Sequence, residues 1–323
     1  MTQSNSFPSG DQPADLDKIR AALLDWFRDA GRALPWRDTR DPYRVLVSEI
    51  MLQQTQVDRV IPKYHAFLTA FPTLEALAAA PTAEVIRAWS GLGYNRRAVN
   101  MQRTARAVLD THGGQFPSDM ATLLTLPGIG PYTAGAIACF AFERDVAFMD
   151  TNIRRVVQRL FVGPAESHAA SEARLLEIAL AAIPAGQGWA WNQAIMELGA
   201  LICTSAAPAC WRCPLRADCR AYAAWRSADE QAFGDGQAAV PAPRRRMAER
   251  REAPYSGSNR FYRGRAIEAL RGLPPHTSMP LLDLGRHVKQ GFGDDDLPWL
   301  RAVVEGLARD GLLVLDGDAA RLP

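Results

Sequence analysis

The sequence predicts an all-α main domain followed by a small, separate C-terminal module. Between residues 15 and 222, apolar side chains recur at the spacing of one helix face, as Ile19, Leu23 and Phe27 do, and alternating strand patterns are absent. The chain has 323 residues, 48% of them hydrophobic, which is enough to bury a sizeable core in more than one domain.

The elements follow in order along the chain. Residues 1–14 are rich in Ser, Pro, Asp and Gln, and we expect a disordered tail there, ahead of a helical domain over 15–225. Asp41 and Pro42 predict a helix start, because Asp caps a helix and Pro fits its first position. Apolar periodicity predicts further helices at 57–70, 74–79, 82–89, 95–111, 118–125, 131–141, 152–161, 171–182 and 189–202.

Residues 226–259 are rich in Ala, Gly, Pro and Arg and are predicted to be a basic linker. Their arginines are typical either of a phosphate-attracting segment or of a solvated linker. The C-terminal module, 260–323, has helical patterns near 262–272, 279–289 and 296–309, then two short apolar runs around a turn at Asp316-Gly317-Asp318. Three helices that close on a hairpin predict a winged-helix-like module.

The N-terminal residues are polar and lack the charged and apolar regions of a signal peptide. No apolar run approaches the roughly 20 residues of a membrane span, so no membrane contact is expected. Four of the five cysteines cluster, and Cys139 lies in an apolar run where a buried thiol is expected. A reducing, cytoplasmic location fits this cysteine usage, and the net charge of +2 says little about partners.

Four cysteines, Cys203, Cys210, Cys213 and Cys219, have the spacing C-x6-C-x2-C-x5-C. A loop this short can place four thiolates around one metal centre. Structural zinc sites usually consist of two separated C-x2-4-C pairs, whereas iron–sulfur clusters are held by compact runs. One close pair with two unequal wider gaps therefore favours a [4Fe–4S] cluster over zinc, and two disulfides or four unrelated thiols are the alternatives.

A glycine-rich turn joins two predicted helices at Leu126-Pro127-Gly128-Ile129-Gly130-Pro131. Gly128 and Gly130 leave backbone N–H groups uncovered, and the next helix begins at Pro131, so its positive end faces the same side. This geometry suits a DNA phosphate, although such a turn also occurs in ordinary helical hairpins.

Two carboxylates stand out. Asp150 precedes the helix that begins near Asn152, where an Asp usually acts as an N-cap, and an N-capping carboxylate is expected to stay ionised and fixed in direction. Glu49 has the helical neighbours Val45, Leu46 and Leu52, so its surroundings are predicted to be apolar. Desolvation favours the protonated form that a general acid requires, although a lone Glu there is also typical of a salt-bridge partner.

The string around Glu49, Ser48-Glu49-Ile50-Met51-Leu52-Gln53-Gln54-Thr55-Gln56, closely resembles the signature of the A/G-specific adenine DNA glycosylases of the MutY family. The hairpin also resembles the helix-hairpin-helix of DNA repair glycosylases. The resemblance covers about residues 16 to 222 and includes Leu34-Pro35-Trp36-Arg37, the Glu49 string, Trp89–Tyr94, the hairpin, Asp150, Asn192-Gln193-Ala194 and the cysteine loop.

The resemblance implies a glycosylase core of two helical lobes with an iron–sulfur loop. It implies a monomeric enzyme that removes adenine mispaired with 8-oxoguanine or guanine in double-stranded DNA. Glu49 would protonate the flipped adenine at N7, and Asp150 would stabilise the oxocarbenium ion. Further positions match by the same resemblance: Tyr132 and Asn152 order the site, Trp36, Arg37 and Gln193 form the adenine pocket, and Gln54, Thr55, Leu92 and Tyr94 wedge into the stack and probe the opposite base.

Two departures from the family pattern matter. Tyr132 stands where endonuclease III-type relatives carry a catalytic Lys, so we expect a monofunctional enzyme without Schiff-base lyase chemistry. Arg154 and Arg155 do not replace that Lys, since a guanidinium stays protonated. The C-terminal module is also shorter and more helical than the large β-rich domain with which known members read 8-oxoguanine.

Two other functions stay open at this stage. A mismatch thymine or uracil glycosylase would share the hairpin, the Asp and the cluster, although Gln53–Gln56 with Trp36-Arg37 argues against it. A non-catalytic iron–sulfur DNA-binding protein is disfavoured because both carboxylates stand in their motifs.

Overall fold

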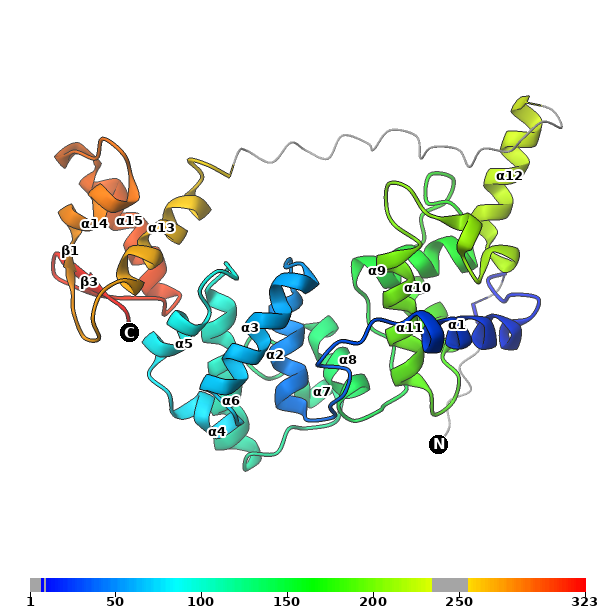
Figure 1. The fold of residues 1–323 in the computed structure, drawn as a ribbon, viewed down its shortest axis with the longest axis horizontal. Helices are drawn as coiled ribbons and strands as arrows, with labels where there is room; N and C mark the ends of the chain where they lie inside the picture. Colours follow the sequence, from blue (N-terminus) through cyan, green and yellow to red (C-terminus); the bar gives the residue numbers. More distant parts are fainter. Residues whose placement is uncertain (1–6, 9, 234–254) are drawn as a thin grey trace. The chain divides into compact units, whose positions relative to one another are not determined.

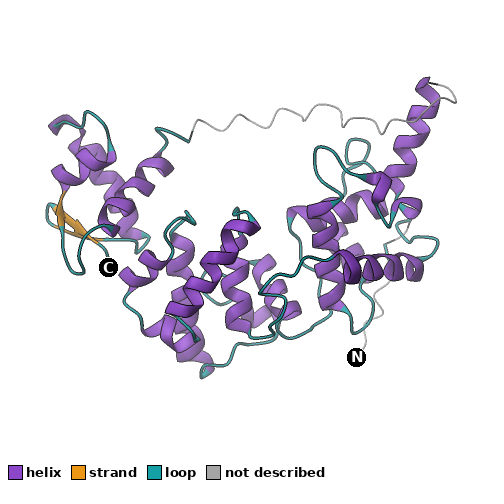
Figure 2. Cartoon of the chain, in the orientation of Figure 1, coloured by secondary structure: helices purple, strands orange, loops and turns teal. Residues whose placement is uncertain are grey.

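The structure, a computed structural model, describes residues 7–8, 10–233 and 255–323. Helices dominate these residues, and one small sheet lies near the C-terminus (Figures 1 and 2). The predicted all-α fold class is therefore confirmed. The α-helices of the described residues are α1 (Leu16–Ala30), α2 (Pro42–Leu52), α3 (Val57–Ala70), α4 (Leu74–Ala79), α5 (Thr82–Ala88), α6 (Arg96–His112), α7 (Met120–Leu123), α8 (Pro131–Phe140), α9 (Thr151–Val157), α10 (Glu172–Ala182), α11 (Gly188–Leu201), α12 (Arg220–Phe233), α13 (Asn259–Arg271), α14 (Leu281–Val288) and α15 (Leu297–Arg309).

The chain forms two compact units, and their boundaries differ from those of the predicted domains. Unit 1 is Met1–Val45, Ser118–Met120 and Gly130–Met247, and unit 2 is Leu46–Pro117, Ala121–Ile129 and Ala248–Pro323. The division passes through α2 and through the turn before α8. The C-terminal residues therefore belong to the same unit as α3 to α6.

Unit 1 is built around α11, against which α1 and α9 pack. Its largest fully buried side chains include Trp191, Phe148 and Phe161. A π-helical turn, η1 (Gln158–Val162), continues α9 and contacts α12. Side-chain caps fix the helix starts, as at α1, where the Asp15 carboxylate accepts a hydrogen bond from the Lys18 amide.

Unit 2 contains a helical layer in which α4 and α5 pack on α6. Its C-terminal part has the order α13, β1 (Met279–Pro280), α14, α15, β2 (Val314–Asp316) and β3 (Ala319–Arg321). The three strands form an antiparallel sheet of order β1-β3-β2, with Leu315 and Met279 both opposite Ala320. Three helices with a closing β2–β3 hairpin match the predicted winged-helix-like module, and β1 adds a strand that the sequence did not indicate.

Three local differences from prediction have physical causes. Helix α12 runs through 226–233, where a linker was predicted, and the rest of that linker up to residue 254 lies outside the described residues. Asp11, within the predicted tail, is buried because Arg174 and Arg220 pair with it. The helix predicted at 118–125 is only α7, followed by the turns that lead into the hairpin.

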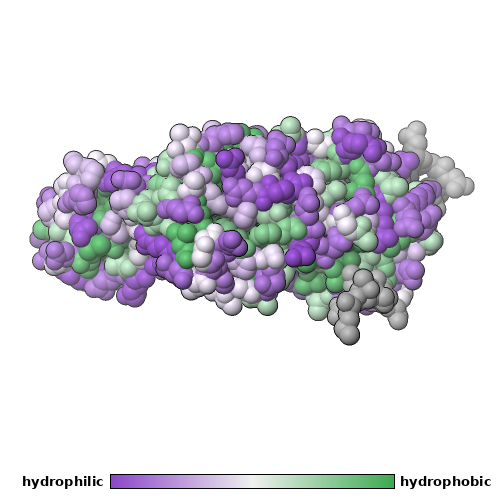
Figure 3. Space-filling model, turned by 90° about the horizontal axis from the view of Figure 1, so that it is seen from below, coloured by the Kyte–Doolittle hydropathy of each residue, from purple (hydrophilic) through white to green (hydrophobic). Residues whose placement is uncertain are grey.

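No helix in the described residues is long and apolar enough to cross a membrane. On the face drawn in Figure 3, apolar residues are interspersed with polar ones and do not gather into one band.

Candidate active site

Asp150 is the N-cap of α9, as its sequence context predicts. One carboxylate oxygen accepts a hydrogen bond from the Ile153 amide at 2.6 Å, and the other accepts one from Asn152 Nδ2 at 3.0 Å. Burial raises the pKa of the Asp150 carboxyl, while these hydrogen bonds and the charge of Arg155 act to lower it. The N-cap thus fixes the direction of Asp150, but burial opposes the ionisation that we expected the cap to secure.

Arg155 links Asp150 to the cysteine loop, a role that sequence reasoning missed. Its guanidinium donates to Asn152 Oδ1 at 2.8 Å and to the Cys203 carbonyl at 2.6 Å. It also donates to the Gly199 carbonyl at 2.7 Å. One hydrogen-bonded chain therefore runs from Asp150 through Asn152 and Arg155 to the backbone of Cys203. It orients both the amide nitrogen and the amide oxygen of Asn152.

Helices α9 and α11 approach closely beside this chain. A Cβ added at Gly199 would lie 2.7 Å from the Cβ of Asn152, which is closer than packed atoms tolerate. Tyr132, on α8, packs edge-on against Phe148 with the ring centroids 5.5 Å apart. Tyr132 is thereby held against the segment that leads directly into Asp150.

Glu49 lies on α2 in unit 2 and is only 3% exposed, as its apolar neighbours predict. Val45 and Leu46 are buried beside it along the helix. A buried carboxyl must be either neutral or compensated by a partner, so Glu49 is not a solvated surface charge.

The predicted adenine-pocket residues form a buried ionic network in unit 1. Arg37 donates to Gln193 Oε1 at 2.8 Å and to Glu197 at 2.8 Å, and Arg32 donates to both carboxylate oxygens of Glu197. Burial alone would raise the pKa of Glu197, but the hydrogen bonds from Arg32 and Arg37 outweigh it and lower the pKa to about 2. Trp36 is also buried. The structure thus brings Arg37 and Gln193 into direct hydrogen-bond contact, and Glu197, which sequence reasoning did not single out, holds Arg37 from its other side.

The residues predicted to probe the opposite base lie in unit 2, around the loop before α6. Tyr94 is exposed and has a positive φ of 46°, and Gln54 has a φ of 54°. Leu92 is buried. Thr55 donates its hydroxyl to the Gln53 carbonyl.

Arg97 joins two segments of this region by hydrogen bonds, a role that sequence reasoning also missed. Its guanidinium donates to the carbonyls of Ile50 and Gln53 at the end of α2, and to that of Leu92. Burial lowers the Arg97 pKa to about 10. Because one side chain holds both segments, Gln54 and Tyr94 are fixed relative to each other.

The hairpin turn is shaped by Gly128, which has a φ of 78°. A Cβ at Gly128 would lie 2.7 Å from the Cβ of Asn100, so only glycine fits. Thr104 donates to the Pro127 carbonyl at 2.6 Å, and Gly130 is the N-cap of α8 with Pro131 in its first turn. The turn therefore has the form that the sequence predicts for an anion site at a helix start.

The four clustered cysteines line one small cavity in unit 1, together with Arg159. Arg159 donates to Cys203 Sγ at 3.4 Å. Burial is the main cause that raises the pKa of Cys213 to about 12 and that of Cys219 to about 11. Among the described residues, no set of His, Cys, Asp or Glu side chains converges on a single ion. Four half-buried cysteines around a shared space provide the thiol set that an iron–sulfur cluster requires.

Comparisons with known proteins identify the family of the chain. Residues 47–179 match the model of the HhH-GPD superfamily base excision DNA repair proteins. The adenine DNA glycosylase of Mycolicibacterium smegmatis is 42% identical over 264 residues, which cover 81% of this chain and 83% of that protein. The human adenine DNA glycosylase is 40% identical over 218 residues, covering 64% of this chain and 40% of that protein.

Solved structures show the same fold. A thermostable thymine-DNA glycosylase is 31% identical, with a TM-score of 0.61, over 65% of this chain and 97% of that one. A trapped endonuclease III–DNA covalent intermediate is 24% identical, with a TM-score of 0.56. The match covers 66% of this chain and 99% of that one, and it supports the fold alone. The chain belongs to the adenine DNA glycosylase family within the HhH-GPD superfamily of base excision DNA repair proteins.

Proposed function

We propose that this DNA glycosylase hydrolyses the N-glycosidic bond of adenine mispaired with 8-oxoguanine or guanine. The observation that carries the proposal is the Asp150 carboxylate, which hydrogen bonds from Ile153 and Asn152 hold in one direction at the start of α9. The relatives named adenine DNA glycosylase support the choice of base.

The chemistry divides between two carboxyl groups in different environments. Glu49, buried on α2, acts as the general acid that protonates the flipped adenine at N7 and then helps to activate water. Asp150 stabilises the positive charge that develops on the sugar as the glycosidic bond breaks. Gly128 and Gly130 hold a DNA phosphate at the hairpin, while Arg37 positions Gln193 in the base pocket.

The enzyme is monofunctional in this proposal. Tyr132 offers no amine for a Schiff base, and Arg155 is committed to Asn152 and to backbone carbonyls. Arg154 is paired with Glu172. No lysine lies between Lys63 and Lys289, so no amine of this part of the chain can form the Schiff base, and strand cleavage requires added alkali.

Cys203, Cys210, Cys213 and Cys219 hold a [4Fe–4S] cluster in the proposed enzyme. These four residues would hold the cluster as thiolates, and the cluster would cross-link the loop. Arg155 on α9 and Arg159 on η1 connect to this loop through Cys203. The role of the cysteine loop is thus to fix the helix on which Asp150 is mounted.

A mismatch thymine glycosylase is the second candidate, and the 31% identity to a thymine-DNA glycosylase favours it. One experiment separates the two: base release from otherwise identical duplexes that carry A:8-oxoguanine, A:G, T:G or U:G. We expect adenine release from the first two, strand cutting only after alkali, and loss of release in Glu49→Gln.

The matched control is Glu177→Gln, which removes an exposed carboxylate from α10 and should release adenine like the parent. Release of thymine or uracil in place of adenine would overturn the proposed base. Strand cutting without alkali would overturn the monofunctional mechanism.

A further inference from the structure

The C-terminal module, residues 255–323, is joined to α5 and α6 by a common core. Ile86 and Val99 from these helices are buried in one apolar cluster with Leu270, Leu307 and Leu312 of the module. Polar contacts reinforce it: Arg271 donates to the Ile86 carbonyl, Arg87 to the Leu273 carbonyl and the Ala83 amide to the Pro323 carbonyl. Within unit 2 the module is thus a fixed part of the lobe that carries Glu49.

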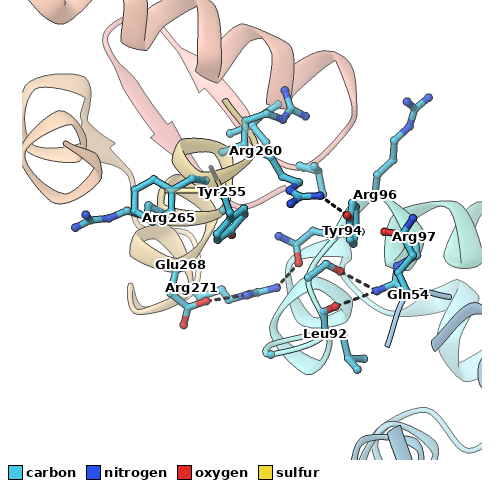
Figure 4. A pocket seen from close by; sticks show the side chains of 18 of the residues that line it. Gln54, Leu92, Tyr94, Arg96, Arg97, Tyr255, Arg260, Arg265, Glu268 and Arg271 are labelled. Atoms are coloured by element: carbon cyan, nitrogen blue, oxygen red, sulfur yellow. Dashed lines mark hydrogen bonds and ion pairs between the residues drawn. The ribbon is translucent and has the colours of Figure 1, made fainter. Parts of the chain in front are cut away.

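This packing leaves a groove of about 1190 Å³ between α13 and the loop that precedes α6 (Figure 4). The charged side chains that line the groove are mostly positive, with seven arginines and one glutamate. They are Arg59, Arg96, Arg97, Arg260, Arg263, Arg265, Arg271 and Glu268.

More than half of these arginines pair with no carboxylate in the part of the chain that the structure describes. Arg271 pairs with Glu268, and Arg96 and Arg263 pair with Asp310. The remaining four arginines, Arg59, Arg97, Arg260 and Arg265, form no ion pair with any carboxylate of the described residues. A concave surface with this excess of cations attracts a polyanion.

Two exposed aromatic rings flank Arg260. Tyr94 is 45% exposed and Tyr255 is 54% exposed. The Arg260 guanidinium lies 5.4 Å from the Tyr94 ring centroid and 4.9 Å from that of Tyr255, and it donates to the Tyr94 hydroxyl at 2.5 Å. Exposed rings beside a planar cation make a stacking platform for bases, which a merely acidic peptide would not require.

The backbone holds this platform in a strained form. Tyr94 and Gln54 are two of four non-glycine residues with positive φ in the described residues, and both line the groove. Arg97 braces them by its hydrogen bonds to the Gln53 and Leu92 carbonyls. Strain of this kind persists where the surrounding structure over-determines it, and it clusters at ligand-binding sites.

We propose that this groove is a DNA-binding surface built jointly by the C-terminal module and the loop before α6, with Arg260 as its central contact. It holds substrate DNA that flanks the excised nucleotide. Gln54, which lines the groove, follows Glu49 in the chain and lies just beyond the end of α2. The inference rests on the proposed function for the identity of the DNA, and the matched family region, 47–179, does not include the module.

The test uses the full chain carrying Glu49→Gln, so that bound DNA is not processed. Binding to a labelled duplex with A opposite 8-oxoguanine is measured by fluorescence anisotropy over a range of salt concentrations. Arg260→Ala should weaken binding about 10-fold, as expected for a lost charge-assisted contact. It should also reduce the slope of log K against log salt by about 1.

The matched control is Arg286→Ala, which removes one exposed arginine from α14, outside the groove. It should leave both quantities unchanged. Arg260→Lys should recover the salt slope but not the full affinity, because it restores the charge without the planar stacking surface. Equal effects of Arg260→Ala and Arg286→Ala on DNA binding, or no effect of either, would contradict the proposal that the groove binds DNA.

The two proposals fail separately. If the parent chain releases adenine while Arg260→Ala binds like the control, the proposed function stands and the groove is wrong. If the parent chain releases no adenine while Arg260→Ala still weakens DNA binding, the groove stands and the proposed function is wrong.

Discussion

At the scale of single residues, arginines organise the candidate site. Arg155 orients Asn152 beside Asp150, Arg37 holds Gln193, and Arg97 fixes the segments that carry Gln54 and Tyr94. Their hydrogen bonds end largely on backbone carbonyls and buried acceptors. Each is therefore a positioning residue, and its removal would leave buried acceptors without donors.

Glu197 gives a pH-dependent prediction at this scale. Its pKa of about 2 in the folded protein lies below its usual value of 4.5, so its ionised form stabilises the fold. Glu197→Gln should lower the free energy of unfolding by roughly 3 kcal/mol at pH 7. The difference should be complete above about pH 4.5 and should vanish as the pH falls towards 2, because the parent Glu197 then becomes protonated.

The measurement is urea unfolding of the parent and the variant at a series of pH values, with the exposed Glu177→Gln as control. A stability difference that does not shrink on acidification would contradict the ionic origin of this effect.

The residue scale also shows what the sequence could reveal about the site. The cap at Asp150 and the burial of Glu49 depend on neighbours within a few positions, and both were predicted correctly. Glu197 was missed because its partner Arg37 lies 160 residues away, and no local pattern links them. The direction of the Asp150 pKa depends on burial in the folded unit, which the local cap did not predict.

At the scale of elements, most helices agree with their apolar periodicity to within a few residues. The exceptions are α7, shortened where turns lead into the hairpin, and α12, which extends into the predicted linker. The attachment of the module to α5 and α6 was not predictable, because apolar residues such as Ile86 and Leu270 do not indicate their partners. Helix periodicity predicts that a face is buried but not what covers it.

The contact between α9 and α11 yields an element-scale prediction. Gly199→Ala should lower the free energy of unfolding by about 1–3 kcal/mol, because the new methyl group would force the helices apart at Asn152. Adenine release should fall as well, since Asn152 orients Asp150.

The comparison variant is Gly264→Ala on α13, where the added Cβ would meet only the Tyr255 hydroxyl at 3.6 Å. That change should stabilise the protein by about 0.5–1 kcal/mol through helix propensity. Urea unfolding checks both variants, and similar stability changes would refute the packing argument.

At the scale of the whole molecule, the cysteine loop and the C-terminal module each stabilise one unit from outside its helical centre. The loop is tied to α9 through Arg155 and to η1 through Arg159. The module completes the core around Ile86 and Val99. Deleting the module would expose this core, so point substitutions in the groove test its role more cleanly than truncation does.

The proposed cluster gives a prediction for unit 1. Cys213→Ser should lower the iron content, the melting temperature and the DNA affinity together, because metal binding contributes directly to folding. Cys139→Ala, which changes a buried thiol on α8 outside the loop, should keep its iron. Iron analysis, thermal melting and anisotropy measure the three quantities, and unchanged DNA affinity after iron loss would contradict the structural role of the cluster.

The shared core of unit 2 also bears on how the chain folds during synthesis. Arg87 and Leu273, which hydrogen bond across this core, are 186 residues apart. The apolar sides of α5 and α6 therefore leave the ribosome long before α13 and α15 are made to cover them. Such late, non-local pairing slows folding and leaves hydrophobic surface open to chaperones in the interval. The lobe that carries Glu49 reaches its native state only after α13 to α15 have been synthesised.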